Sequence, residues 1–284
     1  MTANEIVSQV KELPLVPETA RKMMSLLNQA DAHRDDLIQT LRCDNVLTAK
    51  LLRVCNSAHA GLKSPVASID QAVLLLGDNT IYRMVCAIGF GGAMGFSLPG
   101  QTVEANGLWG HSLSVGMGAE YLAEIEAYGD CQPSMAFTAG LLHDIGKLVL
   151  NQILTPKHRT EIRALMSRDS FSRFQAEKSV LGADHAEVGA CLLQRWVLPE
   201  IMIEAVANHH APRARPAVEL SAVVYLADCA AHLSGPTPGG SDAFVLRPGP
   251  DLGKLLGLEQ ARVEKIVTGV HGAMKAVNQF IAAA

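Results

Sequence analysis

The sequence predicts an all-α protein built from two helical subdomains. Apolar residues recur at helical spacing in almost every segment of the 284-residue chain, whereas the alternation typical of a strand is not sustained. Hydrophobic residues make up 49% of the chain and aromatic residues only 5%, so the core is expected to consist mainly of aliphatic side chains. This length and composition suit a sizeable folded core and argue against disorder.

The first half contains helix signals separated by turns. Asp44 can cap a helix N-terminus, and Ser68 followed by Gln71 is a capping-box pattern. The glycine-rich residues 89–100 lack the preceding strand and the following Lys-Ser/Thr of a phosphate loop, so we expect either a hinge or close helix packing there. We also expect this stretch to divide subdomain 1–100 from subdomain 101–284. Helices are expected over residues 6–13, from 17, over 35–41, from 45, over 72–76 and over 80–88.

The second half is also a succession of helical patterns. Asp184 with Glu187 three residues later is cap-like, and Pro199 suits the first position of a helix. The segment 234–250 is rich in glycine and proline and is expected to connect two helices. Helices are expected over residues 109–127, 134–154, 160–167, 170–181, 185–196, 199–210, 218–233 and 259–282.

Charge and cysteine usage exclude several classes of protein. The net charge is −4 and no block of Lys and Arg stands out, so direct nucleic-acid binding is not expected. The six cysteines form no CxxC pair, which is typical of free thiols in a reducing compartment. The N-terminus has no signal-peptide pattern, and the uncharged stretch 84–103 is broken by glycines and Pro99. We therefore expect a cytoplasmic protein without a membrane span.

The stretch from Gly140 to Leu148 places ionisable groups inside an apolar helical pattern. Because buried charges need a charged partner or a metal, His143 and Asp144 indicate a site. The two side chains point about 100° apart on a helix, so a shared ion would lie between them. Lys147, one turn beyond His143, could contact a phosphate there, although an exposed lysine with no such role is the commoner case. Gly140 and Gly146 permit close approach of neighbouring helices.

Other His and Asp residues in apolar helical patterns extend this pair to a set of seven. Imidazole and carboxylate groups suit Zn, Fe, Ni or Mn, so the residue types do not choose the metal. An Asp between two metals can bridge them, and such two-metal sites hydrolyse phosphoesters. The alternative is a group of side chains that hydrogen-bond one another without a metal. His232, one turn after Asp228, is expected to form only an intrahelical pair. The candidate ligands are His111, His143, Asp144, His185, His209, His210 and Asp228.

A series of motifs in fixed order makes the chain resemble the HDOD family, the HD-related output domains of bacterial signalling proteins. The motifs of the first half are Leu13-Pro14-Leu15-Val16-Pro17, residues 44–53, Asn56-Ser57-Ala58, residues 68–72 and Leu76-Gly77. Those of the second half are Trp109 with His111-Ser112, residues 140–148, Gly182 with residues 184–190, Trp196 with Leu198-Pro199, His209-His210 with Pro212, and Leu226-Ala227-Asp228.

This resemblance implies an HD-like C-terminal subdomain and a regulatory role. The seven candidate ligands are similar to those of the related HD-GYP cyclic-di-GMP phosphodiesterases. However, residues 211–216 lack the Glu and the Gly-Tyr-Pro of that group, and Gly107 stands where an upstream carboxylate is expected. We therefore expect a regulatory protein that binds other signalling proteins or a nucleotide, carries a metal and has no organic cofactor. The alternatives are a metal-dependent phosphohydrolase acting on a nucleotide or cyclic dinucleotide, with His143, Asp144 and Lys147 catalytic, and a nucleotide sensor without catalysis.

Overall fold

The computed structural model confirms the all-α prediction. It describes residues 1–10, 18–27, 34–56, 65–93, 103–125, 131–168, 171–210 and 220–233, together with 265 and 268–269, and within these ranges every regular element longer than a turn is a helix. The helices are α1 (Ala3–Gln9), α2 (Glu18–Leu27), α3 (Arg34–Arg42), α4 (Asn45–Cys55), α5 (Ile69–Leu76), α6 (Asp78–Ala93), α7 (Val103–Glu124), α8 (Pro133–Leu142), α9 (Gly146–Ile153), α10 (Pro156–Arg168), α11 (Arg173–Leu181), α12 (His185–Arg195), α13 (Glu200–Ala207) and α14 (Leu220–Leu233).

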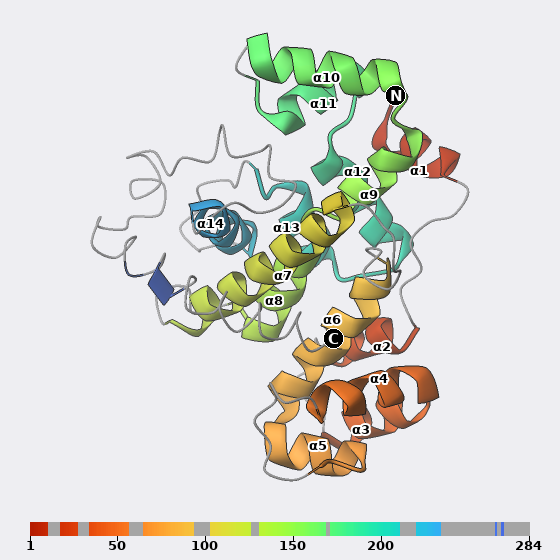
Figure 1. The fold of residues 1–284 in the computed structure, drawn as a ribbon, viewed down its shortest axis with the longest axis vertical. Coiled ribbons are helices and arrows are strands. Elements are labelled where there is room, and N and C mark those ends of the chain that lie inside the picture. Colours follow the sequence, from red (N-terminus) through yellow and green to blue (C-terminus); the bar gives the residue numbers. More distant parts are fainter. Residues whose placement is uncertain are drawn as a thin grey trace.

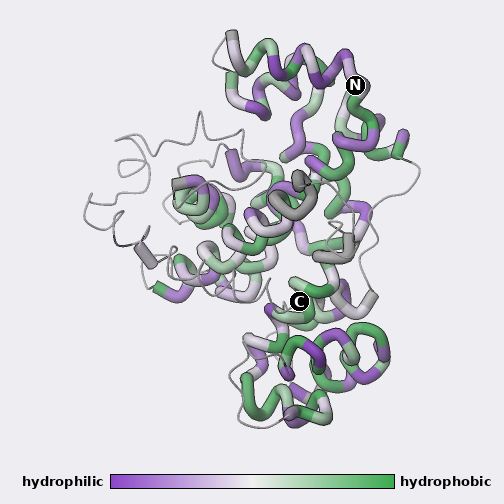
Figure 2. Tube along the Cα trace, in the orientation of Figure 1, coloured by the Kyte–Doolittle hydropathy of each residue, from purple (hydrophilic) through white to green (hydrophobic). Residues whose placement is uncertain are grey.

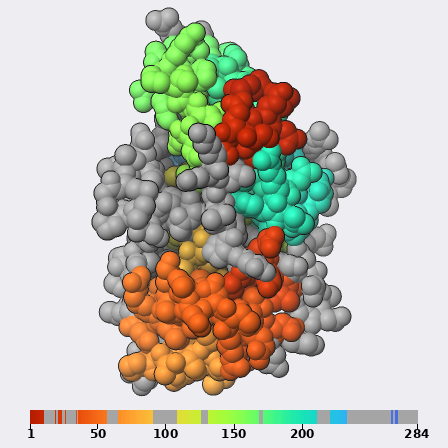
Figure 3. Space-filling model, turned by 90° about the vertical axis from the view of Figure 1, so that its right-hand side faces the viewer, coloured from red at the N-terminus to blue at the C-terminus, as the bar shows by residue number. Residues whose placement is uncertain are grey.

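The helices form a lower lobe and a larger upper region (Figure 1). Helices α2 to α5 and the start of α6 make the lower lobe, whereas α7, α8, α13 and α14 lie at the centre of the upper region. Helix α1 is the first helix of the chain, but it lies in the upper region, where it packs on α9 and α12. The space-filling view shows the same contact (Figure 3). The predicted boundary at residue 100 lies outside the described residues and stays a prediction.

Helix α6 joins the lower lobe to the upper region through three side-chain contacts. Tyr82 and Thr138 hydroxyls lie 2.7 Å apart, and Arg83 Nη1 donates to Glu120 Oε2 at 2.9 Å. The Phe90 and Trp196 rings lie 6.3 Å apart, so Trp196 packs where α6 meets the upper region. The hinge predicted from residue 89 is wrong up to residue 93, where α6 continues. Burial of Phe90 offsets the loss of helix propensity at the neighbouring glycines.

A second difference from the sequence prediction lies at the His-Asp motif. Residues 134–154 were expected to form one helix, but α8 ends at Leu142 and α9 begins at Gly146. The turn between them is tight, since Ile145 N donates to Leu142 O at 3.0 Å and Lys147 N to Asp144 O at 2.9 Å. Apolar periodicity continues through this turn, and therefore the sequence pattern did not reveal it. The break places His143 and Asp144 at the end of a helix.

Helices α10 and α14 differ in polarity. Helix α10, at the top of the view, contains many hydrophilic residues (Figure 2), whereas α14 is apolar except for a few side chains. In the described part of the chain no single helix is long and apolar enough to cross a membrane; only the pair α5–α6 passes by length and composition, and it bends by 119°. The helix predicted over residues 259–282 falls outside the described residues.

Candidate metal centre

All seven residues predicted as metal ligands lie together in the upper region. His111 lies on α7, and His143 and Asp144 occupy the turn after α8. His185 is the first residue of α12, and its N-terminus is fixed by the predicted capping box of Asp184 and Glu187. His209 and His210 directly follow α13, and Asp228 lies in the middle of α14. Five different parts of the chain therefore contribute to one buried group.

Glycines allow the backbones that carry these side chains to approach closely. A Cβ at Gly140 would lie 2.8 Å from Val115 O on α7, which brings α8 against the helix that carries His111. A Cβ at Gly146 would lie only 1.9 Å from His185 O. Any side chain at Gly146 would thus separate α9 from the start of α12. The close approach predicted for Gly140 and Gly146 is confirmed.

The two carboxylate oxygens of Asp144 face two different groups of histidines. Asp144 Oδ1 lies 3.3 Å from His185 Nε2 and 3.9 Å from His209 Nε2. Asp144 Oδ2 lies 3.3 Å from His143 Nε2 and 3.8 Å from His111 Nε2. Two ligands of one metal ion are typically about 3–3.5 Å apart, given ligand bonds near 2.1 Å. Asp144 thus has one oxygen toward each of two groups of side chains that could each hold an ion.

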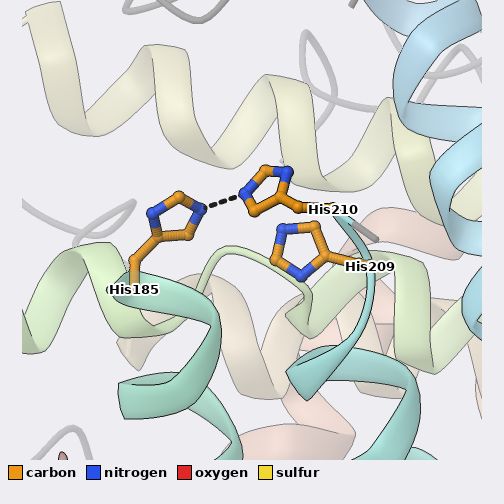
Figure 4. A group of neighbouring side chains, drawn as sticks. All are labelled: His185, His209 and His210. Atoms are coloured by element: carbon orange, nitrogen blue, oxygen red, sulfur yellow. Dashed lines mark hydrogen bonds between the residues drawn. The ribbon is translucent and has the colours of Figure 1, made fainter. Parts of the chain in front are cut away.

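His185, His209 and His210 form the group on the Oδ1 side (Figure 4). His185 Nε2 and His210 Nε2 face each other at 2.7 Å, and the rings of His209 and His210 lie 3.9 Å apart. The ring of Phe174 on α11 stacks on His210 at 4.6 Å with an interplanar angle of 13°. This 2.7 Å separation is that of a hydrogen bond, so an ion shared by the two nitrogens would have to replace that bond and move the rings slightly apart.

Several of the histidines are held by their second ring nitrogen. Nδ1 of His143 lies 2.7 Å from Gly140 O, and Nδ1 of His209 lies 2.7 Å from Val206 O. A carbonyl accepts from an N–H, so the proton is on Nδ1 and the lone pair of Nε2 points into the centre. Histidine ligands of metals are usually oriented by such outer partners.

Glu177 is the outer partner of His185, and it was not singled out from the sequence. Its Oε2 accepts from His185 N at 3.0 Å and lies 2.5 Å from His185 Nδ1. Its Oε1 accepts from Arg173 Nε at 2.8 Å. Glu177 is fully buried although it lies on a helix with charged neighbours. In the sequence, only its position eight residues before His185 connected Glu177 with the candidate ligands.

The centre also contains buried polar atoms without hydrogen bonds. Each such group costs about 1–3 kcal/mol if nothing satisfies it, and therefore requires an explanation. A bound metal would satisfy most of them, because the carboxylate oxygens and one ring nitrogen of each histidine are lone-pair donors that face one another. Among the described residues, the unpartnered atoms of the centre are both ring nitrogens of His111, His143 Nε2, Asp144 Oδ1, His209 Nε2 and Asp228 Oδ1. The residues present therefore fit a metal ion.

Comparison with known proteins shows the family of the chain. Residues 13–212 match the model of the HDOD domain. The chain belongs to the HDOD domain family. A Treponema pallidum protein of uncharacterised function is 26% identical to the HDOD chain over 210 residues, and the match covers 73% of this chain but only 39% of that protein.

Solved HDOD structures share the fold along the chain. An HDOD domain protein of unknown function from Geobacter sulfurreducens is 27% identical with a TM-score of 0.74, over 98% of this chain and 96% of that one. A proposed phosphohydrolase from Shewanella amazonensis SB2B is 26% identical with a TM-score of 0.69, over 98% and 97% of the two chains. A proposed signal transduction protein from Marinobacter aquaeolei VT8, 18% identical with a TM-score of 0.76, shares the fold over 99% of this chain and 64% of that one.

Electrostatics in the HDOD chain keep most of the candidate ligands in their metal-binding protonation state. Burial, aided by His143 and His185, lowers the pKa of His209 to about 3. Burial would raise the pKa of Asp144, but His143 and Lys147 hold it well below its ordinary value. Two histidines are exceptions: burial would lower the pKa of both, but Asp144 and Asp228 raise that of His143, and Glu177 raises that of His185 to about 9. A metal would therefore have to displace a proton from His185 at neutral pH.

Lys147 of the HDOD chain is not the ordinary surface residue that its type suggested. It is buried, and its Nζ donates to Asp144 Oδ2 at 2.7 Å. Because α9 packs on α12 directly after the turn, the side chain of Lys147 remains inside. A fixed positive charge thus lies beside the carboxylate that joins the two groups of histidines.

Proposed function

We propose that this chain is a regulatory output protein of bacterial signal transduction whose state is set by a bound pair of metal ions. The observation that carries the proposal is Asp144, whose two oxygens face separate groups of buried histidines. One ion would be held by Asp144, His185, His209 and His210, and the other by Asp144, His111, His143 and Asp228. Output would take the form of binding to another signalling protein or to a nucleotide.

Burial of the centre favours binding over turnover. His111, His143 and Asp228 are at most 6% exposed, and His185 and His209 are completely buried. A site that surrounds its ion with protein donors is typical of a structural or sensing role, whereas a catalytic site keeps a position open. The six free thiols are consistent with a cytoplasmic location, where such thiols stay reduced.

The type of donor narrows the choice of metal. Histidine nitrogens outnumber carboxylates in the proposed set, and imidazole suits Fe, Ni and Zn better than Mg or Ca. Mn is also compatible because each side includes a carboxylate. We therefore infer a transition metal.

A second candidate function is metal-dependent phosphoester hydrolysis; the name of the Shewanella amazonensis relative proposes that that protein is a phosphohydrolase. The observation in its favour is the buried ammonium of Lys147, which is in place to bind a phosphate oxygen beside Asp144. A metal pair there would supply Lewis acidity to an attacking water and to the phosphate. His143 and Asp144 would position that pair, and the substrate would be a nucleotide or cyclic dinucleotide.

Turnover separates the two functions. The metal-loaded full chain and an Asp144→Ala variant are incubated with phosphomonoesters, nucleotides and cyclic dinucleotides, and product is measured by chromatography. In parallel, hydrogen exchange of α6 and the lower lobe is compared with and without metal. The regulatory proposal expects exchange that changes with metal and no turnover above the variant. Metal-dependent turnover lost in the variant would establish the hydrolase instead.

A further inference from the structure

The Asp228 side of the centre contains a histidine outside the seven predicted ligands. His232 lies one turn after Asp228 on α14, and residues four apart share a helix face. Its side chain is 6% exposed, and its ring packs edge-on against His111 with centroids 4.6 Å apart. The predicted pair with Asp228 is confirmed, since His232 Nδ1 lies 3.0 Å from Asp228 Oδ1. His232 therefore belongs to the same buried group as His111.

Nitrogens from three helical segments converge on a single oxygen, Asp228 Oδ1. His111 Nε2 lies 3.0 Å from it and His143 Nε2 lies 3.8 Å from it, in addition to the nitrogen of His232. A ring nitrogen of His232, one of His111 and a carboxylate oxygen of Asp228 all lie within 4.8 Å of one another. A carboxylate and an imidazole four residues apart on one helix are also spaced to ligate a common ion.

His111 needs such an ion more than the other histidines do. His143, His185 and His209 each have Nδ1 on a carbonyl or carboxylate oxygen. Among the described residues Nδ1 of His111 has no hydrogen-bond partner, and its Nε2 faces the carboxylate oxygens of Asp228 and Asp144 at 3.0 and 3.8 Å without hydrogen-bond geometry, although the side chain is buried. Shared coordination with Asp228 and one more ligand would satisfy His111 and fix its orientation.

We propose that His232 is a further metal ligand, which completes a donor set with His111 and Asp228. This inference rests on the proposed metal centre. It makes the two sides of Asp144 unequal, with five protein donors on one side and four on the other. The five-donor side suits an ion that takes five or six ligands, whereas four donors also suit tetrahedral zinc. The five donors are His111, His143, Asp144, Asp228 and His232.

The competing role for His232 is an intrahelical hydrogen bond. Its Nδ1 also lies 2.9 Å from Asp228 O, so an N–H there would serve the backbone and the carboxylate without touching a metal. Glutamine keeps an N–H donor of similar reach but is a poor ligand for transition metals. His232→Gln therefore separates the two roles.

Metal counting provides the first test. The untagged full chain is stripped with chelator, reloaded with Co2+, dialysed and analysed for metal, and the visible spectrum is recorded. We expect two ions in the wild type and in His158→Gln, a histidine of α10, and one ion, or a second at least tenfold weaker, in His232→Gln. His185→Gln should lose the other ion and change a different part of the spectrum. Two ions bound at wild-type affinity in His232→Gln would overturn the proposal that His232 is a ligand but not the metal centre. No ion in the wild type would overturn both proposals.

A second measurement uses the wild-type protein alone, so it does not depend on whether a variant folds. Wild-type protein with 15N-labelled histidine is loaded with 113Cd2+, and the imidazole nitrogens are observed by NMR. A ligand nitrogen is split by scalar coupling to 113Cd, whereas a hydrogen-bonded nitrogen is not. Coupling at a His232 nitrogen is the expected result. Coupling at other histidines without coupling at His232 would show that His232 is only the intrahelical hydrogen-bond partner of Asp228 and not a metal ligand.

Discussion

Glu177 accepts both the backbone N–H and the Nδ1 proton of His185, the first residue of α12, and thereby fixes the tautomer of a proposed metal ligand. The arrangement carboxylate, imidazole, metal is a common way to orient a histidine ligand and to increase its basicity. Arg173, which donates to the other oxygen of Glu177, keeps the carboxylate ionised together with His185. Glu177 is in this view a positioning residue.

Replacing Glu177 by Gln should weaken metal binding and change its pH dependence. Affinity should fall about 10–100-fold at alkaline pH, since the outer partner of the ligand is lost. In the wild type, affinity should rise with pH up to about 9, because His185 must lose its proton to bind. Without the carboxylate the pKa of His185 falls, so this rise should end at lower pH.

The measurement is competition for Co2+ with a chelating dye between pH 6 and 9. Glu161→Gln, which removes a carboxylate from an exposed pair on α10, is the matched control and should behave as the wild type. A pH profile that is the same in Glu177→Gln and in the wild type would show that Glu177 does not act through His185.

Glu177 also illustrates which parts of the centre could be read from the sequence. The other candidate ligands were found because His and Asp stand out in apolar helical patterns, and the order of motifs indicated the family. Glu177 lies among Arg173 and Lys178, where a carboxylate usually marks a solvated face. Burial of Lys147 was missed for a related reason, because it depends on how α9 packs against α12 and not on local pattern.

The helix break at His143 was beyond the sequence prediction because periodicity reports the burial of a segment and not its continuity. Residues 143–145 are buried, as a helix core would be, so the apolar pattern continues unchanged. The helices with clear caps were predicted well, for example the one that begins after Asp184, because the cap itself is local chemistry.

Replacing Lys147 by Met should destabilise the metal-free protein more than the metal-loaded one. Without the ammonium, the buried Asp144 carboxylate loses its shortest ion pair and keeps only histidines as partners, which costs about 3 kcal/mol. A bound ion would compensate the charge of Asp144 in place of Lys147, so the loss in free energy of unfolding should be smaller in the presence of metal. Urea unfolding with chelator and with Co2+ measures both values. Lys157→Met, in an exposed pair, should change stability by less than about 0.5 kcal/mol. An equal loss with and without metal would contradict the proposed position of the ion.

Gly146→Ala should disrupt the centre. The new Cβ would lie 1.9 Å from His185 O, so backbone must move, and overpacking of this kind costs about 1–3 kcal/mol or more. The movement separates Asp144 from His185, and metal affinity should fall together with stability. Gly77→Ala is the control, because nothing lies within 4 Å of its Cβ although the residue has a φ of 80°. It should cost about 1–3 kcal/mol of stability, because φ 80° with ψ 159° is a glycine conformation, and should leave metal binding unchanged. Wild-type affinity in Gly146→Ala would contradict the close packing of α9 on α12.

Val197→Gly should stabilise the protein. After α12, Val197 N donates to Gln194 O at 3.0 Å and Leu198 N to Leu193 O at 3.1 Å, which is a Schellman ending. The residue in the left-handed position of this motif is usually glycine, but here Val197 has a φ of 58° and is 78% exposed. Removal of the branched side chain should raise the free energy of unfolding by about 1 kcal/mol. Thermal unfolding measures this gain, and an unchanged or lower stability would show that the valine is not strained.

The most direct test of the metal centre is the metal content of the untagged protein compared with that of Asp144→Ala. Both proteins are purified identically, reloaded with a mixture of Fe2+, Mn2+, Ni2+ and Zn2+ under anaerobic conditions, dialysed and analysed by mass spectrometry of the elements. Because Asp144 faces both groups of histidines, we predict about two transition-metal ions per wild-type chain and loss of both, or of all tight binding, in the variant. A wild-type protein that retains no more metal than Asp144→Ala would contradict the account.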